Sequence, residues 1–76
     1  MNEKIKTFLQ KESGRMVEDE NLNLIETGIL DSFSMFKLIS FLEAEFGIRV
    51  DMEKLSSQDM GSVAAITYFV QKQTKS

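Results

Sequence analysis

The sequence contains no cysteine, no histidine, no proline and no tryptophan. Without cysteine and histidine, the chain has no thiol nucleophile, no imidazole base and none of the nitrogen or sulfur ligands that zinc usually takes. Most hydrolytic and redox mechanisms are therefore excluded, and a chain of 76 residues leaves little room for an enzyme cleft. We expect a single domain, residues 1–76, that is not an enzyme.

Long apolar runs and an excess of positive charge are also missing. No run approaches the roughly 20 residues that span a bilayer, and the charged start of the chain has no uninterrupted apolar stretch behind it, as a signal peptide would require. We therefore expect no membrane span and a cytoplasmic location. Nine basic against twelve acidic residues give a net charge of −3, the wrong sign for binding phosphates, so nucleic acid is not an expected partner. An acidic domain is instead steered toward basic surfaces, an effect that salt weakens.

The few glycines fall where helical periodicity stops, which favours an all-α fold. We predict a small antiparallel four-helix bundle with three main helices and one short helix, over residues of about 2–13, 32–46, 56–60 and 61–73. The polar residues 71–76 are expected to fray. Residues 15–31 mix apolar and polar side chains, which favours a long ordered loop, packed over the core, between the first two helices.

The segment 32–46 is the clearest helix in the sequence. At about 100° per residue, five apolar side chains lie within roughly 60° of one line, which is typical of a helix buried on one face: Met35, Leu38, Ile39, Leu42 and Phe46. Asp31 or Ser32 is the expected N-cap, and Gly47 is expected to end the helix.

Two aromatic side chains of this helix lie off its apolar stripe. The helical rotation places Phe33 about 160° and Phe36 about 100° from the core line, beside Lys37 and Ser40. We expect Phe33 to contact a partner protein. Phe36 has two open alternatives, a neighbouring helix or a partner, whereas Phe41 is expected to pack against a neighbouring helix.

The pair Asp31-Ser32 is by itself an ordinary helix start, because Asp and Ser are common N-caps. The informative stretches around it are Glu26-Thr27-Gly28-Ile29-Leu30-Asp31-Ser32-Phe33, Leu38-Ile39 and Leu42-Glu43-Ala44-Glu45-Phe46-Gly47-Ile48, with a weaker continuation through Ser62-Val63-Ala64-Ala65-Ile66. Together they resemble the acyl carrier protein family and cover most of the chain. The resemblance implies a non-catalytic carrier whose Asp-Ser serine, here Ser32, bears 4′-phosphopantetheine.

Elementary physical chemistry is consistent with a group attached at Ser32. The first turn of a helix presents unpaired backbone N–H groups and the positive end of the dipole, which favour a phosphodiester. A flexible arm ending in a thiol also supplies the nucleophile that this chain lacks. Gly28 permits a backbone turn that places Ile29 and Leu30 inward and Ser32 outward. Asp31 caps the helix or, by resemblance, helps the modifying transferase to arrange its metal, and the two roles are compatible.

The resemblance also implies a set of partners. These are a phosphopantetheinyl transferase that uses coenzyme A and magnesium, an acyl- or aminoacyl-loading ligase or adenylation enzyme, and acyltransferase or synthase enzymes. The chain itself is expected to be a monomer. No metal site is expected, because the carboxylate pairs of the sequence are not accompanied by histidine or by a loop with the spacing of a metal site. The expected partner-binding residues are Asp31, Phe33, Phe36, Lys37, Ser40 and Glu43.

The charge of the second helix departs from the family pattern. The resemblance implies several acidic side chains that face basic enzyme surfaces, whereas this helix has only Glu43 and Glu45 against Lys37. The departure favours a dedicated set of partners in a specialised polyketide or nonribosomal peptide pathway, with a fatty-acid or D-alanyl carrier as alternatives. A different class also stays open, an unmodified helical interaction module that docks through Phe33 and Phe36.

Overall fold

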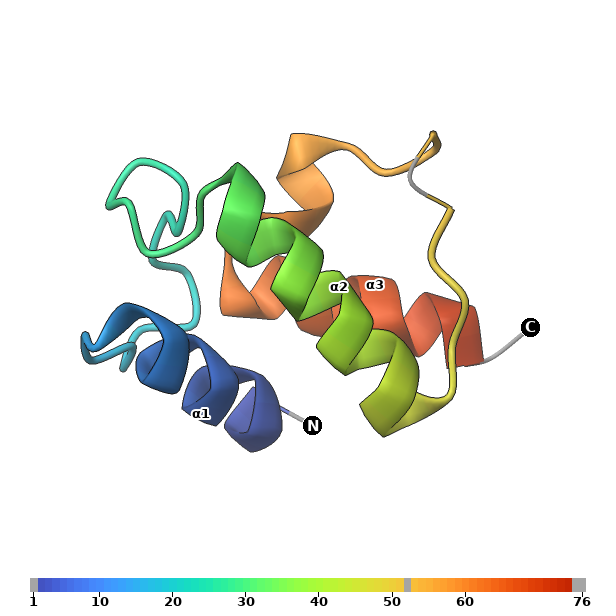
Figure 1. Cartoon of the computed structure of the whole chain (residues 1–76), viewed down its shortest axis with the longest axis horizontal. Coiled ribbons are helices and arrows are strands. Elements are labelled where there is room, and N and C mark those ends of the chain that lie inside the picture. The colour runs from blue at the N-terminus through green and yellow to red at the C-terminus, as the bar shows by residue number, and fades with distance from the viewer. Residues whose placement is uncertain (1, 52, 75–76) are drawn as a thin grey trace.

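Three α-helices make up the frame of the computed structural model, which describes residues 2–51 and 53–74 (Figure 1). They are α1 (Asn2–Ser13), α2 (Ser32–Phe46) and α3 (Val63–Thr74), with a 3₁₀ helix, η1 (Ser57–Met60), before α3. The described residues contain no strand, so the prediction of an all-α fold is confirmed. None of the helices in this part of the chain is long and apolar enough to span a membrane.

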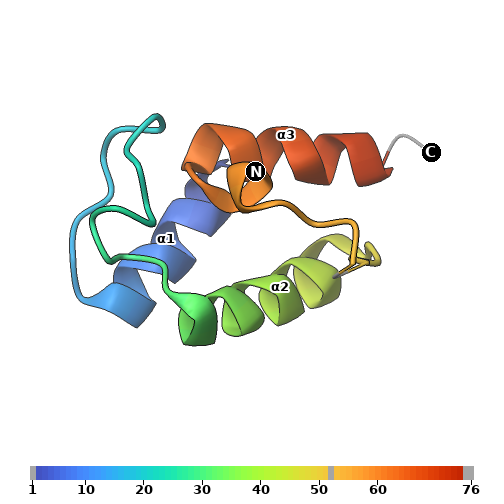
Figure 2. The same ribbon diagram turned by 90° about the horizontal axis from the view of Figure 1, so that it is seen from above.

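The directions of the helices correct one part of the predicted topology. Figures 1 and 2 show α2 and α3 running the same way along the molecule, with α1 running the opposite way. The expected antiparallel arrangement therefore holds for α1 against α2, but not for α2 against α3. The reason is the connection 47–62, which is long enough to carry the chain back beside α2 before α3 begins.

The bounds of α1 and α2 coincide with the predicted ranges because glycine ends both helices. Gly14 and Gly47 have φ angles of 71° and 63°, the left-handed conformation that glycine adopts at little cost. The amide of Gly14 still donates to the carbonyl oxygen of Gln10 at 2.8 Å, which closes the last turn of α1.

The predicted short helix 56–60 is a 3₁₀ turn that begins one residue later. The backbone N–H of Ser56 donates to the Asp59 carboxylate at 3.1 Å, and the N–H of Asp59 donates to the carbonyl of Ser56 at 3.1 Å. The N–H of Gly61 then donates to Gln58 at 3.3 Å. These i to i+3 bonds hold a tight turn that does not continue as an α-helix.

The last helix also differs from the predicted range 61–73. The Ser62 hydroxyl accepts a hydrogen bond from the N–H of Ala65 at 3.1 Å and so acts as the cap, which makes Val63 the first residue of α3. At the other end the helix continues to Thr74, so the expected fraying from Gln71 is wrong for residues 71–74. Residues 75 and 76 lie outside the described residues.

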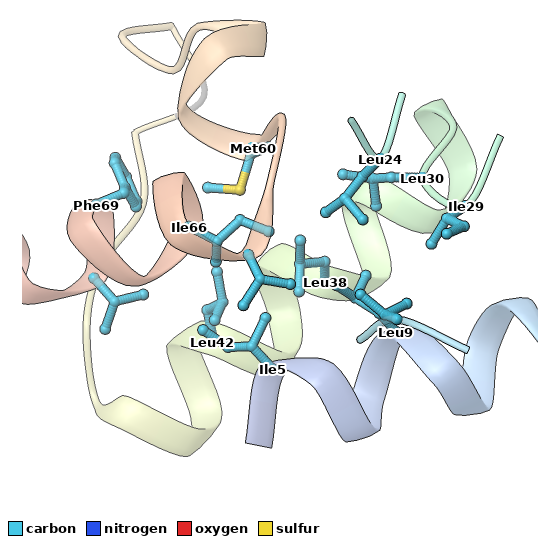
Figure 3. Packing of buried hydrophobic residues seen from close by; sticks show 13 residues of the cluster. Ile5, Leu9, Leu24, Ile29, Leu30, Leu38, Leu42, Met60, Ile66 and Phe69 are labelled. Atoms are coloured by element: carbon cyan, nitrogen blue, oxygen red, sulfur yellow. The ribbon is translucent and has the colours of Figure 1, made fainter. Parts of the chain in front are cut away.

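The buried apolar side chains form one cluster between the helices (Figure 3). On α2, Leu38 and Leu42 are fully buried and Ile39 is nearly so, as the apolar stripe predicts. Met35 and Phe46 are only partly buried and lie at the margin of the cluster. The cluster takes its buried members from all three helices, from η1 and from the segment before α2: Ile5, Leu9, Val17, Leu24, Ile29, Leu30, Leu38, Leu42, Met60, Val63, Ile66, Phe69 and Val70.

A seam of aromatic rings and ion pairs joins α1 to α2. Phe8 and Phe41 stack with their ring centroids 4.6 Å apart, and Phe41 and Phe46 pack nearly perpendicular to each other with their centroids 6.4 Å apart. The prediction that Phe41 packs against a neighbouring helix is thereby confirmed. The Lys4 ammonium and the Glu45 carboxylate form an ion pair across the same seam at 2.5 Å.

The segment 14–31 crosses from α1 to α2 through turns and is fastened to the start of α3. The N–H of Leu24 donates to the carbonyl of Gly61 at 2.8 Å, and the N–H of Ala64 donates to the carbonyl of Glu20 at 3.0 Å. Four apolar side chains of this segment, named above in the cluster, are at most 3% exposed. The chain that leads into α2 is therefore part of the packed structure.

Candidate functional site at the start of helix α2

Asp31, and not Ser32, is the N-cap of α2. Its backbone is extended (φ −114°, ψ −175°), and its carboxylate accepts a hydrogen bond from the N–H of Ser34 at 2.8 Å. Its carbonyl accepts the first helical hydrogen bond, from the N–H of Met35, also at 2.8 Å. Ser32 is consequently the first residue of the helix, exposed, and its hydroxyl is not the group that caps it.

The Asp31 carboxylate is held in its charged form. Hydrogen bonds from Ser34, first from its backbone N–H and then from its hydroxyl, lower the pKa of Asp31 below its usual value of 3.8. No other acidic side chain lies in the first turn of α2. A single negative charge thus sits beside Ser32, at the positive end of the helix dipole.

This capping bond predicts a pH dependence of stability. Because the folded-state pKa of Asp31 is depressed, its contribution is present above the unfolded-state value near 3.8 and is lost as the pH falls through the lower folded-state value. We expect the midpoint of thermal unfolding of the wild type to exceed that of Asp31→Ala at neutral pH, with a gap that narrows toward about pH 3. Circular dichroism of the pair at several pH values tests this. A gap that stays constant over the range contradicts it, and Asp31→Asn, which keeps a capping side chain, serves as the control.

The turn before α2 is built around a glycine with a positive φ. Gly28 has φ 78°, and a Cβ placed there would lie 4.0 Å from the Arg15 guanidinium, which donates to the carbonyl of Thr27. The N–H of Leu30 donates back to the carbonyl of Leu24 at 2.9 Å. Ile29 and Leu30 are buried and Ser32 is exposed, so the predicted inward and outward placement is confirmed.

Gly28 is therefore expected to resist substitution for a conformational reason. Gly28→Ala should lower the free energy of unfolding by about 1 kcal/mol, because a Cβ disfavours the left-handed backbone. Gly28→Asn should lose less, since asparagine tolerates this conformation better than alanine. Urea denaturation of the three proteins measures the difference. Equal losses of unfolding free energy in the two variants would mean that lack of space, rather than the positive φ, makes position 28 intolerant of a side chain.

The outer face of α2 carries most of the predicted partner-binding residues. Phe33 and Phe36 are 70% and 62% exposed, which decides between the two alternatives for Phe36 in favour of solvent. Lys37 and Ser40 are exposed on the same face. Glu43 differs from this group, because it is partly buried and its carboxylate accepts a hydrogen bond from the N–H of Val50 at 3.0 Å.

Lys37 contacts two side chains, and the sequence pattern indicated only one of them. Its ammonium lies 5.0 Å from the centroid of the Phe33 ring and 3.2 Å from the carboxylate of Glu12 on α1. The contact with Phe33 spans four residues on one helix and follows from helical spacing. Glu12 lies far away in the sequence, in a different helix, so no local signal points to it.

The described residues contain no group of three His, Cys, Asp or Glu side chains that could hold a metal ion. Among the residues predicted for the site, Ser32 offers an exposed side chain directly after the residue that caps the helix. The fit is good for a flexible phosphodiester arm, because the hydroxyl faces outward and the fold does not use it as a cap. No protein-family model matches the chain, and a search of curated proteins finds no relative.

Proposed function

We propose that this chain is a freestanding carrier protein of the acyl or peptidyl carrier type, with 4′-phosphopantetheine attached to Ser32. The observation that carries the proposal is an exposed serine at the first position of α2, directly after an aspartate that caps the helix. The attached arm would supply a terminal thiol that holds an acyl or aminoacyl group as a thioester. The protein would then act as a shuttle and not as an enzyme.

The residues around Ser32 support this role in separate ways. Asp31 satisfies the N–H of Ser34, so a substituent on Ser32 leaves the cap intact. The buried Ile29 and Leu30 fix the entry into the helix, which keeps Ser32 on the solvent side. The helix dipole at the first turn favours the negative charge of a phosphodiester.

We further interpret the fold as the four-helix form of carrier domains. In this interpretation η1 is the short helix and residues 14–31 are the long loop that leads to the attachment site. The proposed location is cytoplasmic and the proposed state is a monomer. The proposed partners are a phosphopantetheinyl transferase that uses coenzyme A and magnesium, a loading ligase or adenylation enzyme, and acyltransferase or synthase enzymes.

Within the carrier class, a specialised polyketide or nonribosomal peptide pathway is the preferred assignment. The first turn of α2 contains no acidic residue, and the face beyond it presents Phe33, Phe36 and Lys37. A fatty-acid or D-alanyl carrier remains the alternative within the class. An unmodified helical interaction module is the alternative from another class, and the two exposed phenylalanines are the observation that favours it.

The test of the proposed function is a mass spectrum of the intact protein. Incubation with coenzyme A, magnesium and a broad-specificity phosphopantetheinyl transferase should add the mass of one phosphopantetheine group. Fragmentation of the product should locate the added mass on the peptide that contains Ser32. An unchanged mass would reject the carrier proposal and leave the interaction module.

A further inference from the structure

Asn23 holds together the turn that precedes Ser32. Its side-chain oxygen accepts hydrogen bonds from the backbone N–H groups of Ile25 at 3.1 Å and Glu26 at 2.9 Å. Its carbonyl oxygen accepts from the N–H of Thr27 at 3.2 Å and from the Thr27 hydroxyl at 2.8 Å. One exposed residue thus satisfies three consecutive backbone N–H groups, in the way that an N-cap begins a helical turn.

The turn that Asn23 caps ends at Gly28, where the chain changes direction. The N–H of Gly28 donates to the carbonyl of Ile25 at 3.1 Å, and its φ of 78° is the left-handed conformation that suits glycine. The N–H of Leu30 then donates back to the carbonyl of Leu24 at 2.9 Å, and both leucine side chains are buried. The capped turn and the entry into α2 are therefore one hydrogen-bonded unit.

This unit is also fixed to other parts of the protein. The N–H of Leu24 donates to the carbonyl of Gly61, just before α3, at 2.8 Å. The guanidinium of Arg15, just after α1, donates to the carbonyl of Thr27. With contacts to the ends of two helices, the turn has one orientation relative to the core, and that orientation directs the chain toward Ser32.

Ser32 begins α2 only a few residues after this unit. The first turn of a helix lacks part of its backbone hydrogen bonds and opens more readily than the middle. Here that turn is held by the Asp31 cap, and the buried Ile29 and Leu30 set the position of Asp31. Loosening of the preceding turn therefore reaches the Ser32 hydroxyl before it reaches the buried middle of the helix.

We propose, resting on the carrier function above, that Asn23 is a positioning residue for the modification of Ser32. Its role is indirect, because it orders the turn that sets the direction of the hydroxyl. A misplacement of reacting groups by about 1 Å can slow a reaction by about 10²-fold. Loss of the Asn23 cap therefore lowers kcat more than it changes KM, since the surface that the enzyme binds is retained.

The experiment measures phosphopantetheine transfer by a broad-specificity phosphopantetheinyl transferase, at a temperature where circular dichroism shows each variant to be folded. Asn23→Ala should lower kcat about tenfold and leave KM within about twofold of the wild type. Asn23→Asp keeps an acceptor oxygen and should recover at least about half of the wild-type kcat. The matched control is Asn21→Ala, which removes an exposed asparagine of the same segment that is not the acceptor in these bonds and should leave kcat unchanged.

Hydrogen exchange of the unmodified protein, followed by nuclear magnetic resonance, tests the positioning without an enzyme. The N–H groups of Ser34 and Met35 are bonded to Asp31. Asn23→Ala should speed their exchange by a factor at least about five times larger than for the N–H of Leu42 in the middle of α2. Asn23→Gln, which carries its amide on a longer side chain, should give a smaller change in the same direction. This milder variant provides the measurement if Asn23→Ala does not fold.

Two results would overturn the positioning role alone. The first is a loss of thermal stability in Asn23→Ala with kcat and the exchange of Ser34 unchanged, which would make Asn23 a purely structural residue. The second is an Asn23→Asp protein as slow as Asn23→Ala, because the acceptor oxygen would then not be the active feature. A wild-type protein that is not modified at all rejects the carrier function itself, and the proposal with it.

Discussion

Ser32→Ala is expected to abolish the gain of phosphopantetheine completely, with coenzyme A, magnesium and the broad-specificity transferase in excess. The reason is chemical, since the proposed phosphodiester would be formed on the Ser32 hydroxyl. The fold should be retained, because Asp31 and not Ser32 caps α2. We expect the free energy of unfolding to change by less than about 0.5 kcal/mol, as for a surface substitution.

The control for this result is a second exposed serine on the same helix. Ser40 lies on the outer face of α2 two turns after Ser32, and Ser40→Ala should still acquire one phosphopantetheine group. Intact-mass spectra of the wild type and the two variants, recorded beside their circular dichroism spectra, complete the comparison. Modification of Ser32→Ala to the wild-type extent would place the attachment at another residue.

Leu38→Ala is expected to cause a large loss of stability, about 2–5 kcal/mol in the free energy of unfolding. Leu38 is fully buried at the centre of the cluster, so its truncation removes apolar contacts and leaves a cavity (Figure 3). A domain of this size has a total stability of only about 4–11 kcal/mol. The variant should therefore be partly unfolded at 37 °C, or close to it.

Urea denaturation followed by circular dichroism measures this loss, and Phe36→Ala is the matched control. Phe36 is larger than Leu38 and lies on the same helix, but it is 62% exposed. Its substitution should change the free energy of unfolding by less than about 0.5 kcal/mol. Similar losses for the two variants would mean that Phe36 is buried in solution, which would also remove the basis for docking through this ring.

Local chemistry explains why much of the fold follows from the sequence. The ends of α1 and α2 are marked by Asp31, Gly14 and Gly47, residues whose effect depends on their immediate neighbours. The parallel course of α2 and α3 could not be predicted in this way. It depends on how the connection 47–62 packs, and periodicity within a helix carries no information on direction.

The margins of the core show the same division between local and tertiary effects. Met35 and Phe46 lie on the apolar stripe of α2, yet both are only partly buried. Phe46 instead packs nearly perpendicular to the ring of Phe41, which in turn stacks on Phe8 of α1. Which stripe residues become fully buried depends on the neighbouring helices, and a single helix does not encode that choice.

At the candidate site, helical spacing predicted the exposure of Phe33, and the turn at Gly28 predicted the outward position of Ser32. It left Phe36 undecided, because an angle of about 100° from the core line is compatible with a neighbour or with solvent. The Glu12–Lys37 pair and the Glu43–Val50 bond needed the structure. Both contacts join residues that no sequence pattern pairs, and each engages a charged side chain of this face within the protein.

The hydrogen bonds from Leu24 to Gly61 and from Ala64 to Glu20 tie the turn before Ser32 to residues more than 30 positions further along the chain. The stretch Glu26 to Phe33 is continuous in sequence, but its shape depends on the start of α3. An isolated peptide with this sequence would keep the Asp-Ser letters and lose the orientation of the hydroxyl. The position of Ser32 thus depends on the folded domain, and the transferase that we propose to modify Ser32 would act on the folded protein rather than on a linear peptide.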